Sequence, residues 1–246
     1  MPETEPAVVA QGLRKSYGGH EVLRGVEFTV EAGTVFALLG SNGAGKTTTL
    51  SILTTLLPPD SGTARVAGRD VVREPARVRE AITATGQSVS VDPVLTGREN
   101  LVLVARLRHL AEPKRAAEEL LHRFGLVDAA GKPAATYSGG MQRRLDIAMS
   151  LVGNPEVVFL DEPTAGLDPA GRRDVWQVVR DLASAGTTIV LTTQHMEEAA
   201  ALAGHIAVLH GGTITAVGGH QDILAAGDAD NLEDAFLNLT REGGRP

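Results

Sequence analysis

Residues 34–50, TVFALLGSNGAGKTTTL, constrain the fold of this chain more than any other stretch. The apolar run at 35–39 predicts a buried strand, which leads into a glycine-rich turn and then into a segment suited to a helix. The turn at 40–47 fits the pattern G-x-x-x-x-G-K-[ST] in the strand-then-helix context that this pattern requires. The stretch therefore predicts an α/β core that binds a nucleoside triphosphate.

The turn has the chemistry of a phosphate cradle. Glycines let the backbone turn tightly and point successive N–H groups inward, with no Cβ in the way of phosphate oxygens. The helix that starts near Gly45 directs its positive end at the same anion. We expect Lys46 to reach the β- and γ-phosphates and Thr47 to place its hydroxyl on Mg²⁺. The residues expected to contact the nucleotide here are Gly40, Ser41, Asn42, Gly43, Ala44, Gly45, Lys46, Thr47 and Thr48.

Two adjacent carboxylates follow a second apolar run. The stretch EVVFLDEP predicts a buried strand that ends at Asp161 and Glu162, on the side of the sheet where the cradle also lies. We expect Asp161 to hold Mg²⁺, directly or through water, and Glu162 to polarise the attacking water. The alternative is a pair of solvated acids at the edge of a loop.

Three single residues are further candidates, each with a structural alternative. Tyr17 lies in the predicted turn KSYGGH between strands at 7–13 and 22–30, where its ring either stacks on a base or packs on the surface. Gln87 lies at the end of the strand-like run ITATGQ, where its side-chain oxygen either faces a metal ion or satisfies backbone groups. His195 follows the buried run TTIVLTT and either contacts the γ-phosphate or has a structural role.

A helical insertion separates two of the predicted strands. Leu103, Leu107 and Leu110 fall on one helical face, and residues 117–124 show the apolar spacing of a second helix, with a proline between the two. We expect these helices to form a small lobe beside the sheet.

The stretch TYSGGMQRRLDIAMSL predicts another helix with an unusual start. Ser138 is a favourable N-cap, but Gly139 and Gly140 cost conformational order unless the backbone there must touch something. A helix N-terminus with exposed N–H groups is a second anion site; the alternative is a flexible loop that closes on a helix. For Arg143 and Arg144 we expect a solvated helix face.

Composition limits the classes of function. A chain of 246 residues with 43% hydrophobic content is expected to form one compact α/β unit. Its net charge of −7 and the lack of a dense Lys/Arg cluster argue against direct binding of nucleic acid. It has no cysteine, which excludes disulfides and thiolate chemistry. No apolar stretch approaches the ~20 residues that span a bilayer, so we expect membrane association through a partner.

These motifs together resemble those of the ATP-binding cassette (ABC) transporter ATPases. GSNGAGKT resembles their Walker A motif, YSGGMQ their signature motif, VVFLDEP their Walker B motif and AGLD their D-loop. Gln87 and His195 match the Q-loop and the switch histidine, and Tyr17 falls where the family places its adenine-stacking aromatic residue. The resemblance covers about residues 8–220, and the signature motif separates it from other P-loop enzymes.

The resemblance implies a P-loop NTPase core, with a mostly parallel sheet and flanking helices, an antiparallel β subdomain and a small helical subdomain. The chain, residues 1–246, is then a single nucleotide-binding domain with the helical subdomain at approximately 88–155. ATP and Mg²⁺ are implied, with ATP held in a head-to-tail homodimer between the Walker A motif of one subunit and residues 138–140 of the other. The residues implied in catalysis are Lys46, Gln87, Glu162 and His195, and those implied at the metal are Thr47, Gln87 and Asp161.

A narrower resemblance is to the daunorubicin/doxorubicin-type drug-resistance exporters of bacteria. It rests on ATGQSVSVDPVLTGRENL, on YSGGMQRRLDIAMSLVGNPEVVFLDEPTAGLDP and on the closing LEDAFLNLT. Members of that group often carry a further C-terminal segment before the closing motif, whereas here Asn231 follows the last short helix almost at once.

The resemblance also implies a membrane permease on another chain. The cassette is then soluble when isolated, works at the cytoplasmic face of the cell membrane, and passes its motion to the permease through the helical lobe and residues 88–100. The alternative is a soluble cassette ATPase of translation, DNA repair or metal-cluster assembly. A single cassette, no cysteine, no coiled-coil insertion and an acidic balance argue against that alternative.

Overall fold

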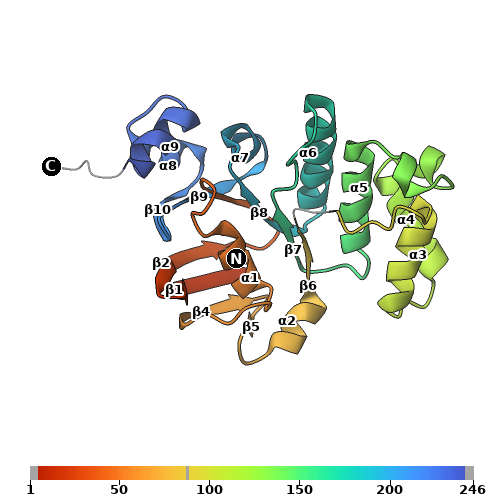
Figure 1. Cartoon of the computed structure of the whole chain (residues 1–246), viewed down its shortest axis with the longest axis horizontal. Coiled ribbons are helices and arrows are strands. Elements are labelled where there is room, and N and C mark those ends of the chain that lie inside the picture. Colours follow the sequence, from red (N-terminus) through yellow and green to blue (C-terminus); the bar gives the residue numbers. More distant parts are fainter. Residues whose placement is uncertain (1–4, 87–88, 242–246) are drawn as a thin grey trace.

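The computed structural model describes residues 5–86 and 89–241. A six-stranded sheet forms its centre, in the order β10 (Thr213–Gly218), β9 (His205–His210), β3 (Val35–Leu39), β8 (Thr188–Thr193), β7 (Val157–Asp161) and β6 (Ile82–Thr85) (Figure 1). The five strands from β9 to β6 run parallel, and β10 pairs antiparallel to β9. The carboxyl ends of β3, β7 and β8 therefore meet at one edge of the sheet.

The three middle strands are buried along their whole length, as their continuous apolar runs predict. Alternate residues of β3 enter two separate hydrophobic cores. Ala37 and Leu39 pack with the helices on one face, whereas Phe36 and Leu38 pack on the other face with the second sheet. The Phe36 ring stacks on Phe28 with 5.0 Å between the ring centroids. The predictions of strands at 35–39 and in EVVFLDEP are confirmed.

The second sheet is antiparallel, in the order β2 (His20–Val30), β1 (Val8–Tyr17), β4 (Ser61–Val66) and β5 (Arg69–Asp70). The turn between β1 and β2 is shorter than predicted. Tyr17 is still part of β1 and pairs with His20, so only Gly18 and Gly19 form the turn. Both glycines have positive φ, 55° and 86°, which matches the twist of a two-residue hairpin.

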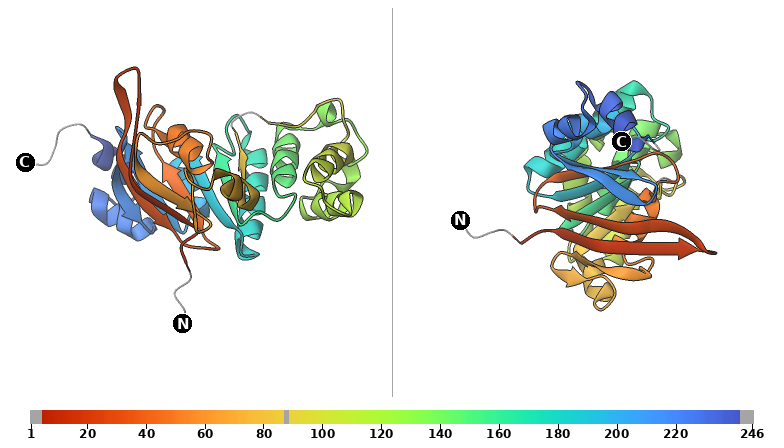
Figure 2. Two further views of the ribbon diagram at one scale, coloured as in Figure 1. Left: turned by 90° about the horizontal axis from the view of Figure 1, so that it is seen from below. Right: turned by 90° about the vertical axis from the view of Figure 1, so that its left-hand side faces the viewer.

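Three helices lie between β6 and β7 in the sequence and project from one end of the sheet (Figures 1 and 2): α3 (Gly97–Leu107), α4 (Pro113–Arg123) and α5 (Gly139–Ser150). The predicted leucine face of the first helix is wrong. Leu103 and Leu107 are 45% and 70% exposed, and Leu110 follows the end of α3. Leu101 and Ala105 are the buried residues, because α3 packs its other side against α4 and α5.

The remaining helices flank the two sheets. They are α1 (Lys46–Leu53), α2 (Pro75–Ala81), α6 (Pro169–Ser184), α7 (Met196–Leu202), α8 (His220–Gly227) and α9 (Leu232–Thr240), with short 3₁₀ turns at Val127–Ala129 and Ala134–Thr136. The Asp168 side chain caps α6 by accepting a hydrogen bond from the Gly171 amide at 3.0 Å. Within residues 5–86 and 89–241, no helix has the length and apolar character needed to cross a membrane.

Candidate functional site

The loop from β3 to α1 is built around glycines that no other residue could replace without strain. Gly43 and Gly45 have φ of 81° and 110°, in the region that L-residues rarely adopt. A Cβ on Gly45 would lie 2.6 Å from a Leu23 methyl carbon, and one on Gly40 would lie 2.6 Å from the Leu209 carbonyl oxygen. The loop is therefore pressed against β2 and β9, and these close contacts restrict its shape.

Lys46 is buried inside this loop. Its ammonium donates hydrogen bonds to the carbonyl oxygens of Gly40 at 2.8 Å and Ser41 at 3.2 Å, and lies 3.4 Å from Glu162 Oε1. A buried charge is tolerated only when it is paired and hydrogen-bonded, and these three oxygens meet that need. The arrangement fixes a positive charge at the mouth of the loop, where a phosphate anion would share it with the Glu162 carboxylate.

Asp161, at the end of β7, is held by two hydroxyl groups. Thr47 Oγ1 donates to Asp161 Oδ2 at 3.2 Å, and Thr192 Oγ1 donates to Asp161 Oδ1. Carboxylate and hydroxyl oxygens suit Mg²⁺, which commonly takes one or two protein oxygens together with phosphate oxygens and water. Among the residues that the structure describes, no group of three or more acidic, histidine or cysteine side chains could hold a metal ion. The Thr47 hydroxyl and the Asp161 carboxylate, 3.2 Å apart, fit Mg²⁺ as a pair of ligands beside a phosphate.

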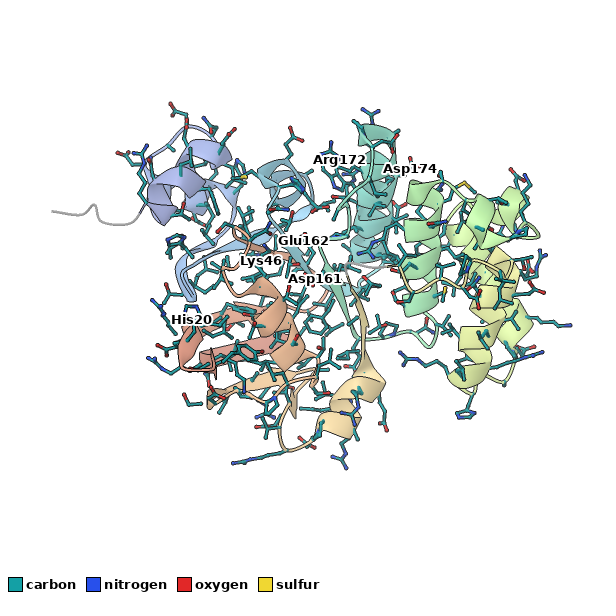
Figure 3. All side chains as sticks on the ribbon, in the orientation of Figure 1. His20, Lys46, Asp161, Glu162, Arg172 and Asp174 are labelled. Atoms are coloured by element: carbon teal, nitrogen blue, oxygen red, sulfur yellow. The ribbon has the colours of Figure 1, made fainter. Side chains whose placement is uncertain are left out.

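Glu162 occupies an unusual backbone conformation. Its φ is 47°, and its amide donates to both the carbonyl oxygen and the hydroxyl of Thr192 at 3.1 Å. A left-handed conformation costs of order 1 kcal/mol for a non-glycine residue, so the contacts with β8 must hold it in place. Lys46, Asp161 and Glu162 lie close together near the centre of the molecule (Figure 3). Lys46 and Glu162 are among the residues that line a pocket of about 210 Å³: Val22, Asn42, Gly43, Gly45, Lys46, Thr47, Thr48 and Glu162.

The weaker candidates occupy different places. His195 caps the start of α7 just after β8, so it lies at the same sheet edge as Glu162, with an exposed side chain. Its amide donates to the hydroxyl of Thr193 at 3.0 Å. Tyr17 is 49% exposed at the end of β1. Gln87 lies outside the described residues.

Residues 138–140 do not join this pocket. Ser138 caps α5, as predicted, and its hydroxyl accepts a hydrogen bond from the Met141 amide at 3.2 Å. Ser138 and Gly139 are exposed, and neither they nor Gly140 lines the pocket. Gly140 has a packing role in the chain itself, because a Cβ there would lie 3.1 Å from the Gly171 Cα. A close approach of α5 to α6 thus explains one of the two glycines.

Sequence reasoning missed several residues of the site. Thr192 and Thr193 support Asp161, Glu162 and the Gly40 amide, which donates to the Thr193 carbonyl oxygen at 3.1 Å. Two polar residues at the end of a buried strand are a signal that could have identified them. Val22 lines the pocket from β2, and nothing local in the sequence predicts that contact.

The expectation of a solvated face for the two adjacent arginines is wrong. Arg143 is 3% exposed and donates to the carbonyl oxygens of Pro163 and Gly86, both at 2.9 Å. Arg144 is partly buried and donates to the Phe124 carbonyl oxygen at 3.0 Å. Burial lowers the pKa of the Arg143 guanidinium and raises the pKa of the neighbouring Asp146 carboxyl. The helix face that carries Arg143 points into the protein because α5 lies between the helical lobe and β7.

Comparison with known proteins agrees with the site. A family model described as ABC transporter matches residues 23–165, more than half of the chain. The daunorubicin/doxorubicin resistance ATP-binding protein DrrA of Streptomyces peucetius is 52% identical over 219 residues, which cover 87% of this chain and 66% of that protein. This chain therefore spans slightly less than two thirds of the length of that relative.

Two solved structures share the fold. The ATP-binding subunit of an ABC transporter superposes with a TM-score of 0.83 at 27% identity, covering 96% of this chain and all of that one. A dimeric ATP-binding cassette in a post-hydrolysis state, bound to ADP and Pi, superposes with a TM-score of 0.76 at 25% identity, covering 86% of this chain and 98% of that one. The fold predicted from the sequence, an α/β core with an antiparallel β sheet and helices, is confirmed.

Proposed function

The chain belongs to the ABC transporter family, whose cassettes bind and hydrolyse ATP, and we propose that it is the ATPase subunit of an efflux system for drugs or lipophilic compounds. The permease of that system is a separate membrane protein. The proposed cargo class comes from the relative named for daunorubicin and doxorubicin resistance.

One observation carries the enzymatic part of the proposal. Four residues from two separate segments converge at the carboxyl ends of the parallel strands: Lys46 and Thr47 at the start of α1, Asp161 at the end of β7, and Glu162 directly after it. Open α/β sheets bind ligands at that edge. Lys46 and the loop amides would bind the phosphates, and Glu162 would accept a proton from the attacking water.

Thr47 and Asp161 are the residues proposed to hold Mg²⁺. Bound there, the ion would neutralise the phosphate charge that develops during transfer. The Thr192 hydroxyl orients one oxygen of Asp161, which leaves Oδ2 directed at Thr47. His195 is proposed to contact the γ-phosphate from the end of β8. Tyr17 is proposed to stack on the adenine ring, and Gln87 is proposed to face the metal.

The active unit is proposed to be a head-to-tail homodimer. Ser138 and Gly139 are exposed and stand apart from the pocket of their own chain, so they are free to meet the nucleotide of a second copy. The amides at the start of α5 suit an anion. ATP bound on the loop of one subunit would then contact residues 138–140 of the other. The dimer closes on ATP and opens after hydrolysis, and the helical subdomain at about 88–155 passes this motion to the permease at the cytoplasmic face of the membrane.

Light scattering on a size-exclusion column tests this proposal. We expect the Glu162→Gln variant to bind Mg-ATP without hydrolysing it and to shift from monomer to dimer when Mg-ATP is added. Adding Lys46→Ala to that variant is the matched control, because it removes the phosphate-binding charge, and we expect it to remain a monomer. If ATP binds tightly to Glu162→Gln without any dimer, the sandwich arrangement is wrong.

The transport role has its own test. Expressed together with the membrane permease of the system, the cassette should be recovered in the membrane fraction, and cells should tolerate more daunorubicin only when Glu162 is intact. Recovery with ribosomes or DNA, and with no membrane protein, would refute the efflux role and support a cassette ATPase that drives no transport.

A further inference from the structure

The buried arginine of α5 reaches the backbone of three segments that surround the candidate catalytic site. Arg143 Nε donates to the Pro163 carbonyl oxygen at 2.9 Å, and Nη1 donates to the Gly86 carbonyl oxygen at 2.9 Å. Nη2 lies 3.4 Å from the Asp161 carbonyl oxygen. Because a guanidinium is a rigid planar fork, a shift of any of these carbonyls must move the arginine or break a bond.

An ion pair on the same helix extends this contact. Arg143 Nη1 also donates to Asp146 Oδ2 at 2.9 Å, and Asp146 Oδ1 accepts a hydrogen bond from the Ser90 amide at 2.9 Å. Both side chains are 3% exposed. The pair therefore ties α5 to Gly86, which directly follows β6, and to Ser90.

A second buried carboxylate places a negative charge near Arg143. Glu198 of α7 is 1% exposed, and its Oε1 accepts hydrogen bonds from the Thr164 hydroxyl at 2.8 Å and the Trp176 indole at 3.2 Å. Burial lowers the pKa of Arg143, whereas the charges of Asp146 and Glu198 oppose that shift. The turn that follows Glu162 is thus held from one side by Arg143 and from the other by the helix that begins after His195.

The helix that carries Arg143 also carries the exposed serine and glycine. Ser138 caps α5 and Arg143 lies five residues later, about 7.5 Å along the helix axis at 1.5 Å per residue. A helix of this length moves as a rigid element, so its buried and exposed faces shift together. Ser138 can therefore move when the carboxyl end of β7 moves, without a direct contact between the two.

We propose that Arg143 is a positioning residue. It couples the conformation of the turn at Asp161 and Glu162 to the position of Ser138 and Gly139 at the start of α5. Arg143 touches neither nucleotide nor reacting atoms in this arrangement. Its effect on hydrolysis runs through α5, which sets how the exposed helix start meets the nucleotide of the second subunit. The inference rests on the proposed dimer, in which that helix start completes the partner's site.

The decisive variant removes both charges of the pair. Truncating Arg143 alone would leave Asp146 buried and unpaired, which destabilises the fold, whereas replacing a buried pair with apolar residues of similar volume is often neutral or stabilising. We therefore expect Arg143→Met with Asp146→Leu to fold and to keep the affinity for a fluorescent ATP analogue, with a lowered thermal midpoint because the Pro163 and Gly86 carbonyls and the Ser90 amide lose their partners. Its kcat should fall about 10- to 100-fold with KM little changed, since a misplacement of about 1 Å costs up to 10²-fold.

Two further variants separate positioning from folding. Arg144→Met is the matched control, because Arg144 lies on the same helix but contacts the Phe124 carbonyl oxygen and Asp174 instead of the β7 turn. We expect it to keep kcat within about threefold of wild type. Arg143→Lys keeps the positive charge beside Asp146 but lacks the planar guanidinium, so it should fold and still lose turnover. This variant replaces the double variant in the test if the double variant fails to fold.

A distance measurement completes the test. The chain has no cysteine, so spin labels can be placed at Lys114→Cys on α4 and Glu27→Cys on β2, both exposed, without background. We expect Mg-ATP to shift the distance distribution in the otherwise wild-type chain and in Arg144→Met, but not in the double variant. The inference is overturned if the double variant and Arg143→Lys both keep wild-type kcat, or if the labelled wild-type distance does not respond to ATP. Failure of the proposed dimer would appear separately, as a Glu162→Gln protein that binds ATP and stays monomeric.

Discussion

The phosphate-binding loop and the start of α5 are both glycine-containing helix N-termini, yet the chain completes only the first. Around the loop, Lys46 and Asp161 are buried, and their polar atoms have partners in the same chain. At the start of α5, Ser138 and Gly139 are exposed, and the Ser138 hydroxyl accepts the capping hydrogen bond from the Met141 amide. The phosphate site is therefore organised by the fold of one chain, whereas the exposed start of α5 is proposed to meet an anion bound by a second chain.

The glycines of the two regions also differ in what they do. Gly45 has a positive φ and lies against Leu23, so the backbone itself requires a glycine. Gly140 has no such conformation and is explained by the close approach of Gly171. Changes at the loop should therefore impair nucleotide binding within one chain, and changes at α5 should impair the encounter of two chains.

The largest expected effect is on hydrolysis in the first region. Glu162→Gln should slow ATP turnover by about 10²-fold or more while leaving ATP affinity near that of wild type, because the amide cannot accept the proton of the attacking water. Steady-state phosphate release and equilibrium binding of a fluorescent ATP analogue measure the two quantities. Turnover at the wild-type rate would remove Glu162 as the base.

Gly45→Ala should distort the phosphate-binding loop of the chain that carries it. The added Cβ meets Leu23 at 2.6 Å and the backbone keeps φ of 110°, so we expect the free energy of unfolding to fall by about 1–3 kcal/mol and ATP affinity to fall with it. Urea unfolding and ATP titration check this. Gly139→Ala is the matched control on α5, since Gly139 has no positive φ and its Cβ would lie 3.3 Å from a Leu167 methyl carbon. An equal loss of ATP affinity in both variants would contradict the comparison.

Ser138→Ala should separate the second region from the first. Loss of the N-cap is expected to cost about 1 kcal/mol of unfolding free energy, and ATP affinity of the monomer should be unchanged. In the Glu162→Gln background, the ATP-dependent dimer should weaken, which analytical ultracentrifugation would measure. Weaker ATP binding by the monomer would place Ser138 in its own chain's site and remove the distinction drawn above.

The smallest expected effect is on folding stability, at an ion pair beside the antiparallel sheet. The Lys15 ammonium and the Ser16 amide hold the pKa of Asp60 below its usual value of 3.8 through hydrogen bonds of 2.7 Å. A lowered pKa in the folded state contributes stability above the unfolded pKa, and that contribution is lost as the pH falls through the folded value. Asp60→Asn should lower the urea midpoint slightly at neutral pH, with a difference that shrinks below about pH 4. A difference that grows on acidification would contradict the sign.

The elements that local sequence predicted correctly share one property. The buried strands β3 and β7 and the cap at Ser138 are set by apolar runs or by hydrogen bonds within a few residues. The face of α3 was mispredicted because Leu103 and Leu107 share a helical spacing but the neighbouring helices cover the opposite side. Helix α2, at Pro75–Ala81, was not predicted, and it is only seven residues long.

The sequence by itself determined the phosphate-binding loop and its chemistry, because backbone geometry at Gly43 and Gly45 and the spacing to Lys46 are local properties. Which groups meet at the loop depends on the packing of distant segments. Thr192 reaches Asp161 because β7 and β8 are neighbours in the sheet, although the two residues are 31 positions apart in the chain. Arg143 is buried for the same physical reason. The packing of distant segments, and not the sequence pattern around a residue, determines which polar side chains are buried.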